Sequence, residues 1–226
     1  MKVFVVGLKS KLLEKRLLEK GFVLDYNTPE VVFTYGGDGT ILASERSYPG
    51  VPKVTIKHSL FCYKCAFKEE ELESILTRIK NKKHKIEEHT KIKTTAKTKT
   101  LVSLNEIQLH NKKPTKAIRF NIYVDKKILF ENVVGDGVVI ATPYGSTAYY
   151  KSVGGKSFKK GIGIALNNPH THESSVVVNN SSEIEIEILR ECAQLFSDND
   201  DKSVVVLNPK DRIIVKKHLN TAKFIV

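Results

Sequence analysis

Hydrophobic positions in the first 85 residues recur alternately at strand-like and helix-like spacing. Short apolar runs are typical of buried strands, and the segments that follow them carry apolar side chains three or four positions apart. The expected strands cover residues 2–7, 30–35 and 51–58, and the expected helices cover residues 10–21, 40–48 and 68–83. Alternating strands and helices predict a parallel sheet with helices packed on it.

From about residue 90 the hydrophobic period changes to two. Ile184, Ile186 and Ile188 alternate with glutamates, so one face of that strand is expected to be buried and the other solvated. Three hairpins are expected in residues 119–134, 174–189 and 202–217, with turns at Asp125–Lys127, Asn179–Ser182 and Asn208–Pro209. This half of the chain is expected to be an antiparallel β domain.

These patterns predict an α/β plus all-β chain. We expect a Rossmann-like α/β domain over residues 1–87 and an antiparallel β-sandwich domain over residues 88–226. The 226 residues, 41% of them hydrophobic and 27% charged, suit a folded soluble protein. No apolar run approaches the roughly 20 residues that span a bilayer. The first 20 residues are typical of a strand and an amphipathic helix, not of a signal peptide, so a cytoplasmic location is expected.

Cysteine and charge add two observations. Cys62 and Cys65 form a C-x-x-C that lacks the further thiols of a zinc site, and packed or incidental cysteines are the favoured interpretation over a redox or metal role.

The net charge is +12, and residues 78–100 hold nine Lys and Arg against two Glu. Such a run attracts nucleotides, polyphosphate or nucleic acid. Taken alone, the run is better explained as the solvated surface of a helix and a strand.

A glycine-rich turn, Gly36-Gly37-Asp38-Gly39-Thr40, separates the second expected strand from a helix. Glycines allow positive φ and a close approach to a ligand, and exposed N–H groups at a helix start attract phosphate. Asp38 would then hold a magnesium ion that bridges to phosphates, or accept a proton from an attacking hydroxyl. The alternative is a tight turn in which Asp38 caps the helix.

A second polar loop is expected in residues 133–155, where a strand runs into the turn Pro143-Tyr144-Gly145. Its candidate ligand contacts are the hydroxyls of Thr142, Ser146 and Thr147, the rings of Tyr149 and Tyr150, and the Asp136 carboxylate. The alternative is an ordinary loop. Because each half has one such loop at strand ends, a shared cleft is expected.

Asn105 and Glu106 interrupt an apolar pattern in residues 101–110. A neighbouring amide and carboxylate can hold the two hydroxyls of a ribose, although residues on a surface strand look the same.

These three motifs, in this order, resemble the signatures of the NAD kinase family. The family has GGDGT near the end of an α/β half, Asn-Glu in the first β strands, and GDG followed by TP-x-GSTAY in the β half. Residues 168–188 also resemble the family's Pro-His-Thr segment and the hairpin after it. GGDGT alone is shared with lipid and sphingoid kinases, so the long second motif makes the resemblance specific. It covers about residues 30–215.

The resemblance implies transfer of the terminal phosphoryl of ATP, or of polyphosphate, to the adenosine-ribose 2′-hydroxyl of NAD, which gives NADP. It implies that Asp38 is the catalytic carboxylate. It implies a phosphate loop of Gly36, Gly37, Gly39 and Thr40, and NAD contacts from Asn105, Glu106, Asp136, Thr147, Ala148, Tyr149, Ser152 and Tyr63. Mg²⁺ or another divalent cation and a homodimer or homotetramer are also implied.

The chain departs from the family in several places. Ser59 and Cys62 stand where a Gly-x-x-Gly-Phe-like loop has glycines, and Tyr63 replaces its aromatic residue. The late Asp-Gly is replaced by a stretch in which Asp198 is the expected equivalent. His170 and His172 have His-x-His spacing without an evident third metal ligand.

Two other functions remain open. A lipid or sphingoid kinase of the GGDGT type would need an apolar groove or a membrane-facing patch. A non-catalytic dinucleotide-binding or nucleic-acid-binding protein would have no need of Asp38. We expect NAD and ATP or polyphosphate as partners, and neither nucleic acid nor membrane.

Overall fold

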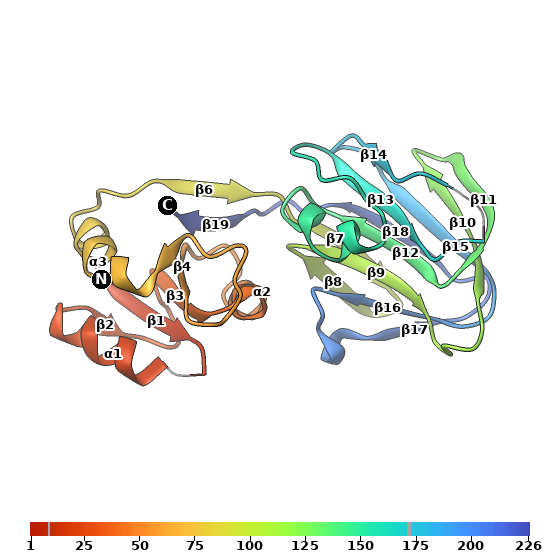
Figure 1. The fold of residues 1–226 in the computed structure, drawn as a ribbon. Coiled ribbons are helices and arrows are strands. Elements are labelled where there is room, and N and C mark those ends of the chain that lie inside the picture. The colour runs from red at the N-terminus through yellow and green to blue at the C-terminus, as the bar shows by residue number, and fades with distance from the viewer. Residues whose placement is uncertain (9, 171–172) are drawn as a thin grey trace. The chain divides into compact units, whose positions relative to one another are not determined.

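The computed structural model describes residues 1–8, 10–170 and 173–226 and divides the chain into two compact units (Figure 1). The first unit is Met1–His89 together with Thr221–Val226, and the second is Thr90–Asn220. The sequence placed one boundary at residues 87–88. In the structure the chain passes between the units a second time, because the strand at residues 222–225 returns to the sheet of the first unit.

The first unit is built on a sheet in the order β2-β1-β3-β4-β19-β6, with β5 beside the end of β4. All of its pairings are parallel except that of β6 with β19. The strands are β1 Lys2–Val6, β2 Val23–Leu24, β3 Val31–Gly36, β4 Lys53–Lys57, β5 Phe67–Lys68, β6 Ile86–His89 and β19 Ala222–Ile225. The parallel α/β prediction is confirmed, although the three short strands β2, β5 and β6 and the strand β19 were not expected there.

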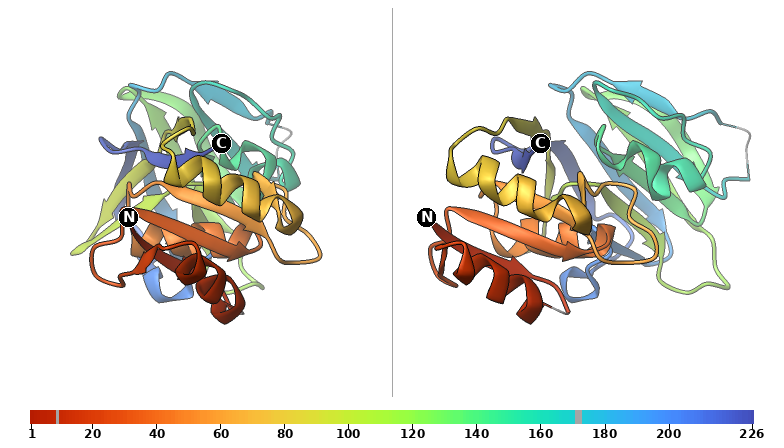
Figure 2. Two further views of the ribbon diagram at one scale, coloured as in Figure 1. Left: turned by 90° about the vertical axis from the view of Figure 1, so that its left-hand side faces the viewer. Right: turned by 60° about the vertical axis from the view of Figure 1, so that its left-hand side comes forward.

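The helices α1 Ser10–Glu19 and α3 Leu72–Lys80 lie on the same side of this sheet (Figure 2). Their apolar stripes, such as Leu13 and Leu17, join one core cluster with alternate residues of β1, β3 and β4. The helix α2 Asp38–Ser47 buries Ile41 and Leu42 outside that cluster, and a 3₁₀ turn, η1 Glu69–Glu71, precedes α3.

The second unit is an antiparallel β-sandwich, as predicted. One sheet has the order β11-β10-β15-β18-β7-β8 and the other β14-β13-β12-β9-β16-β17, and their inner faces form one apolar core. The strands are β7 Ile92–Ala96, β8 Lys99–Ser103, β9 Glu106–Asn111, β10 Ile118–Val124, β11 Lys127–Gly135, β12 Gly137–Ala141, β13 Ile162–Asn167, β14 Val176–Val178, β15 Ile184–Arg190, β16 Ala193–Ser197, β17 Val205–Leu207 and β18 Arg212–Lys217. Short helical turns are η2 Gly145–Thr147, α4 Tyr149–Ser152 and η3 Asp201–Ser203.

One of the three predicted hairpins is present. Asp125 and Lys126, both with positive φ, join β10 to β11, which pair directly. The turns at Asn179–Ser182 and Asn208–Pro209 do not close hairpins, so those two predictions are wrong. In each case the strand before the turn belongs to one sheet and the strand after it to the other. Period-two alternation shows that a strand has one buried face, but both sheets of a sandwich satisfy it equally.

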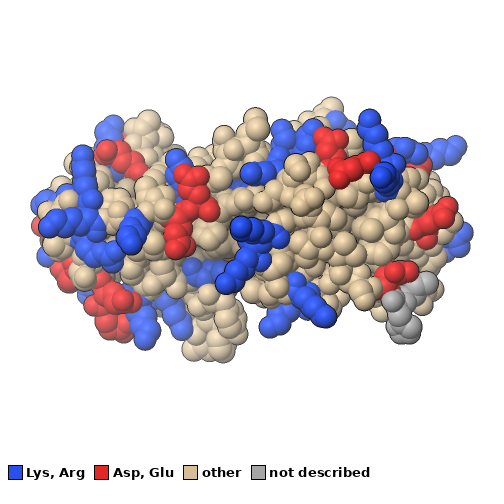
Figure 3. All heavy atoms as spheres, turned by 90° about the horizontal axis from the view of Figure 1, so that it is seen from above, with Lys and Arg blue, Asp and Glu red and all other residues tan. Residues whose placement is uncertain are grey.

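The basic residues are distributed over the surface and are interspersed with carboxylates. Figure 3 shows Lys and Arg side chains across the face it presents, with Asp and Glu between them. The basic run includes the end of α3, β6 and the β7–β8 hairpin, where most of its lysines are exposed. Among the helices that the structure describes, none has the length and apolar character needed to cross a bilayer.

Candidate functional site

The GGDGT turn lies at the carboxyl end of the parallel sheet, as predicted. β3 ends at Gly36 and α2 begins at Asp38, with Gly37 in extended backbone as the N-cap and no side-chain cap. The alternative in which Asp38 caps the helix is therefore wrong. Asp38 occupies the first helical position, and its carboxylate is directed to another part of the chain.

Close packing explains two of the glycines, and the predicted positive φ is wrong for Gly36, Gly37 and Gly39. A Cβ on Gly36 would lie 2.3 Å from Thr40 Oγ1, and one on Gly37 would lie 2.8 Å from Ser59 Oγ. Around Gly39 no described atom lies within 4 Å of such a Cβ, so this position is open. The turn keeps its backbone accessible at the helix start, where N–H groups favour an anion.

The Asp38 carboxylate is held by the backbone of the loop between β4 and β5. The Tyr63 N–H donates to Oδ2 at 3.1 Å and the Lys64 N–H donates to Oδ1 at 2.9 Å. Cys62 Sγ lies 3.2 Å from Oδ1. Two backbone donors fix the orientation of the carboxylate and leave lone pairs on both oxygens for a further donor.

The loop that holds Asp38 is closed by a disulfide between Cys62 and Cys65. The sequence favoured packed or incidental cysteines, and that interpretation is wrong. Because both sulfurs are bonded, the contact of Cys62 Sγ with Asp38 is not a hydrogen bond. In the sequence, the C-x-x-C falls in the loop where the family's Gly-x-x-Gly pattern is lost, which marks this loop as unusual. No feature of the neighbouring sequence predicts that the loop folds back onto Asp38.

A pocket of about 460 Å³ adjoins the turn in the first unit and is lined by residues 57–60 and 68–70. The His58 N–H donates to the Gly36 carbonyl at 3.0 Å, and the His58 ring stacks on Tyr35 at 4.0 Å. His58 Nδ1 lies 3.1 Å from Glu69 Oε2. Hydrogen bonding by Tyr35, and then by His58, lowers the pKa of Glu69. Lys57 and Lys68 place cationic side chains on the wall of this pocket.

In the second unit, Asp198 fixes the turn that carries Asn105 and Glu106. This buried carboxylate accepts hydrogen bonds from the Ser103 hydroxyl and from three successive N–H groups, those of Leu104 at 2.7 Å, Asn105 at 2.8 Å and Glu106 at 3.3 Å. The turn is rigid because one side chain satisfies its free backbone donors. The Asn105 Oδ1 and Glu106 Oε2 atoms are buried and have no hydrogen-bond partner among the described residues.

Glu106 is 1% exposed, and its side chain accepts a hydrogen bond from Gln108 Nε2 at 3.3 Å. Burial, with a smaller contribution from the charge on Asp198, raises the pKa of Glu106 to about 8. Near pH 7 its carboxyl is therefore largely protonated and can donate as well as accept a hydrogen bond.

The Asn-Glu turn and the TPYGSTAY segment are in direct contact. The Thr142 N–H donates to the Asn105 carbonyl at 2.9 Å, and a Cβ on Gly145 would lie 2.1 Å from that carbonyl oxygen. Glycine is therefore required at position 145 for contact between the two motifs. This contact gives a geometric reason why they occur in one protein.

Three of the side chains expected at this loop have structural roles. Thr142 and Ser146 are buried and donate their hydroxyls to the carbonyls of Leu104 and Pro143. Tyr150 is fully buried and packs on Phe158, so it presents no face for stacking. Those predictions are wrong, because the short helix α4 uses this side of the segment to cover β12 and β13.

The neighbouring positions remain available to a ligand. Thr147 and Ser152 are exposed, and Ala148 and Tyr149 are half-buried. The Tyr149 hydroxyl accepts a hydrogen bond from Asn167 Nδ2 at 3.1 Å, which fixes the ring.

Asp136 lies apart from this group. It precedes β12, at the end opposite to Thr142, so the two positions are about 20 Å apart along the strand. Its carboxylate accepts hydrogen bonds from Asn111 and Asn168 at 3.1 and 3.0 Å. Within this unit the structure therefore does not bring Asp136 together with Asn105 and Glu106.

No built metal site is found in the part of the chain that the structure describes, where no three His, Cys, Asp or Glu side chains group as ligands. His172, one half of the His-x-His pair, lies outside the described residues. Mg²⁺ commonly binds through one or two carboxylates plus substrate phosphates. The Asp38 carboxylate, which keeps lone pairs on both oxygens, fits the single-carboxylate kind of site, and the ion would be carried by the phosphate donor.

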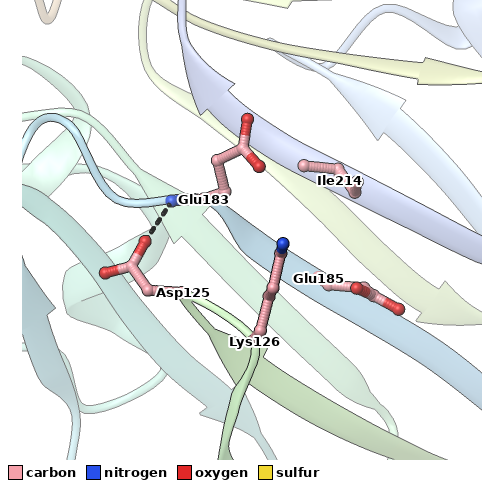
Figure 4. A pocket seen from close by; sticks show the side chains of 5 residues that line it. All are labelled: Asp125, Lys126, Glu183, Glu185 and Ile214. Atoms are coloured by element: carbon pink, nitrogen blue, oxygen red, sulfur yellow. Dashed lines mark hydrogen bonds between the residues drawn. The ribbon is translucent and has the colours of Figure 1, made fainter.

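A second pocket, of about 340 Å³, contains none of the predicted site residues (Figure 4). It lies on the outer face of a sandwich sheet, where Asp125 accepts hydrogen bonds from Ser182 Oγ at 2.9 Å and from the Glu183 N–H at 3.0 Å. These bonds hold the turn before β15 against the β10–β11 hairpin, so the carboxylate has a structural role.

The family model for the ATP-NAD kinase C-terminal domain matches residues 104–226. That match covers more than half of the chain. This chain belongs to the ATP-NAD kinase family. The family's C-terminal domain thus coincides with most of the sandwich unit and the returning strand β19.

Several NAD kinases are similar to this chain over most of its length. The NAD kinase of Carboxydothermus hydrogenoformans is 30% identical over 87% of this chain and 74% of its own length. A bifunctional NADP phosphatase/NAD kinase of Methanococcus maripaludis is 31% identical over 94% of this chain. This chain spans 39% of the length of that protein and 37% of the Methanocaldococcus jannaschii counterpart.

Two solved structures of family members share the fold. Yeast NADH kinase complexed with NADH superposes with a TM-score of 0.88 at 20% identity, covering 100% of this chain and 83% of that one. An NAD kinase from Archaeoglobus fulgidus in complex with ATP gives 0.85 at 22% identity, covering 99% and 93%. The α/β plus β-sandwich architecture is therefore that of the family.

Proposed function

We propose that this chain is an NAD kinase, which transfers the terminal phosphoryl of ATP to the adenosine-ribose 2′-hydroxyl of NAD. Family membership supports this function, and the observation that carries it is the oriented Asp38 carboxylate at the start of α2. Its two oxygens are fixed by backbone donors beside a turn suited to phosphate. The family match gives no support to a lipid or sphingoid acceptor.

Asp38 acts as the proton acceptor or orienting group for the ribose hydroxyl. A hydroxyl is a poor nucleophile, so its attack on phosphorus depends on positioning and on a group that takes its proton. A divalent cation carried by ATP supplies charge neutralisation at the phosphates. Gly36, Gly37, Gly39 and Thr40 bind the donor phosphates through the backbone at the helix start.

The Asn-Glu turn binds the dinucleotide. Asn105 Oδ1 and Glu106 Oε2 are buried polar atoms without a described partner, and a bound molecule with hydroxyl or amine donors would satisfy them. Thr147, Ala148, Tyr149 and Ser152 provide the adjoining surface, and Tyr63 provides an exposed ring in the first unit.

Three further points belong to the proposal. Asp136, which is remote from the Asn-Glu turn of its own unit, serves the NAD site of a neighbouring subunit in a homodimer or homotetramer. Polyphosphate is the alternative donor. The protein acts in the cytoplasm.

The test is an NADP-formation assay with ATP and polyphosphate as parallel donors and with NAD and diacylglycerol as parallel acceptors. The Asp38→Asn variant is expected to bind NAD with unchanged affinity and to lose about 10²- to 10⁴-fold in kcat. NAD binding without NADP formation by the unchanged protein would show that the chain only binds the dinucleotide. Phosphate transfer to diacylglycerol alone would replace the proposal with a lipid kinase.

A further inference from the structure

The orientation of Asp38 depends on a loop that is 25 and 26 positions away in the sequence. The two N–H donors to its carboxylate belong to Tyr63 and Lys64, the residues between Cys62 and Cys65. The disulfide therefore closes a small ring that contains both of these N–H groups. Among the described residues, no other backbone group is shown to hold the Asp38 carboxylate.

The large apolar side chains of this loop contribute little to its position. Leu60, Phe61 and Tyr63 are 84%, 69% and 85% exposed, so its large apolar side chains are not anchored in a core. Hydrogen bonds are present at both ends of the loop, from Ser59 Oγ to the Phe61 carbonyl at 2.5 Å and from the Ala66 N–H to Thr55 Oγ1 at 2.8 Å. The disulfide is the covalent constraint on the segment between them, and such rigid support is what a precise site requires.

We propose, on the basis of the kinase function proposed above, that the Cys62–Cys65 disulfide is a positioning element for Asp38. Reduction of the disulfide by a dithiol slows phosphoryl transfer, and reoxidation restores it. A thiolate of the dithiol attacks one sulfur of the disulfide, which breaks the Cys62–Cys65 bond and forms a mixed disulfide between the dithiol and one cysteine. The second thiol of the dithiol then attacks the dithiol's own sulfur in this mixed disulfide and releases the cysteine. Two electrons and two protons pass to Cys62 and Cys65, and the dithiol becomes a cyclic disulfide.

Reduction acts on Asp38 in two ways. It opens the ring, so the Tyr63 and Lys64 N–H groups are no longer held toward the carboxylate. It also gives Cys62 Sγ, 3.2 Å from Asp38 Oδ1, a hydrogen that it can donate to that oxygen. This S–H competes with the substrate hydroxyl for the proton-accepting lone pair. Both effects lower kcat more than they change the KM for NAD.

The experiment compares oxidised protein with protein treated with dithiothreitol, in an NADP-formation assay with ATP, Mg²⁺ and NAD. Maleimide labelling followed by mass measurement verifies the redox state, because one thiol, Cys192, is expected to react in the oxidised protein and three in the reduced protein. We expect kcat to fall about 10- to 100-fold on reduction and to recover on reoxidation.

Two variants separate this effect from a general effect of thiols. Cys62→Ser/Cys65→Ser is expected to be as slow as the reduced protein and insensitive to dithiothreitol. Cys192→Ser, which changes the free cysteine outside this loop, is expected to respond as the unchanged protein does. Equal kcat in verified oxidised and reduced protein, or a response to dithiothreitol in the double variant, overturns the proposal.

Hydrogen exchange tests the same link without turnover. Amide exchange in the peptide that contains Tyr63 and Lys64 is expected to rise on reduction and also in oxidised Asp38→Asn, while β10 and β15 exchange unchanged. An unchanged rate for this peptide on reduction overturns the proposal. Absence of NADP formation in both redox states would instead contradict the kinase function, and exchange would still decide whether the disulfide holds Asp38.

Discussion

The protonation of Glu106 is predicted to make the stability of this fold fall as the pH rises through neutrality. Its pKa rises from the ordinary 4.5 to about 8, mainly through burial. Between these values the folded chain keeps a proton that the unfolded chain has released, so the free energy of unfolding decreases with increasing pH. Below 4.5 the carboxyl is neutral in both states and has no such effect.

The size of this effect follows from the width of the interval. One pKa unit corresponds to about 1.4 kcal/mol. A carboxyl whose pKa moves from 4.5 to about 8 thus lowers the free energy of unfolding by up to about 5 kcal/mol at pH 8 and above. Burial also raises the pKa of the neighbouring Asp198, so the release of its proton acts on the stability in the same direction.

The Glu106→Gln variant removes the titrating group and keeps the side-chain volume. We expect it to be within about 1 kcal/mol of the unchanged protein at pH 5 and more stable by about 3 kcal/mol or more at pH 8. Urea unfolding followed by circular dichroism from pH 5 to pH 8.5, with unchanged m values, measures the difference. The comparison is Asp198→Asn, which should be less stable at both pH values because an amide NH2 group replaces one of the two oxygens that accept hydrogen bonds from the N–H groups of this turn. Parallel pH profiles for Glu106→Gln and the unchanged protein would refute the reasoning.

Two further predictions concern the first unit. Gly39→Ala should raise the free energy of unfolding by about 0.5–1 kcal/mol, because its Cβ meets no described atom and alanine favours a helix. Gly36→Ala should lower the free energy of unfolding, because its Cβ would meet Thr40. Thermal unfolding of the two variants measures both changes, and equal shifts would contradict the packing argument. Lys53→Met should destabilise the fold by about 3–5 kcal/mol, because it removes the ammonium group that pairs with the buried Glu45 carboxylate and donates to the carbonyls of Tyr48 and Val51. Chemical unfolding measures this loss. A free energy of unfolding within about 1 kcal/mol of that of the unchanged protein would contradict the prediction.

Local pattern was sufficient for the elements that lie in one sheet and have regular spacing. The apolar stripe of α3, the strand before GGDGT and the Asp125–Lys126 turn all follow from short-range rules and are present. The turns at Asn179–Ser182 and Asn208–Pro209 failed because partner choice in a sandwich is a long-range property. β2 and β5 are two residues long, too short for any periodicity.

The candidate site divides in a similar way. Residue type and motif order were sufficient to propose Asp38, Asn105 and Glu106 as candidates, and the resemblance to a family was needed to separate the Asn-Glu pair from ordinary strand residues. Contacts between distant segments were not predictable. The sequence does not show that Asp198 accepts hydrogen bonds from the Asn-Glu turn, 92 to 95 positions away, or that Tyr150 is fully buried beside an available Tyr149.

The returning strand β19 affects the order in which the protein can be made. Residues 222–225 pair with both β4 and β6, so the first sheet has a gap until the ribosome has added these residues. The sandwich, which is continuous in sequence from Thr90 to Asn220, can fold on the emerging chain before then. The α/β unit, whose strands come from both before and after the sandwich in the sequence, is therefore completed after the sandwich and needs protection from aggregation for longer.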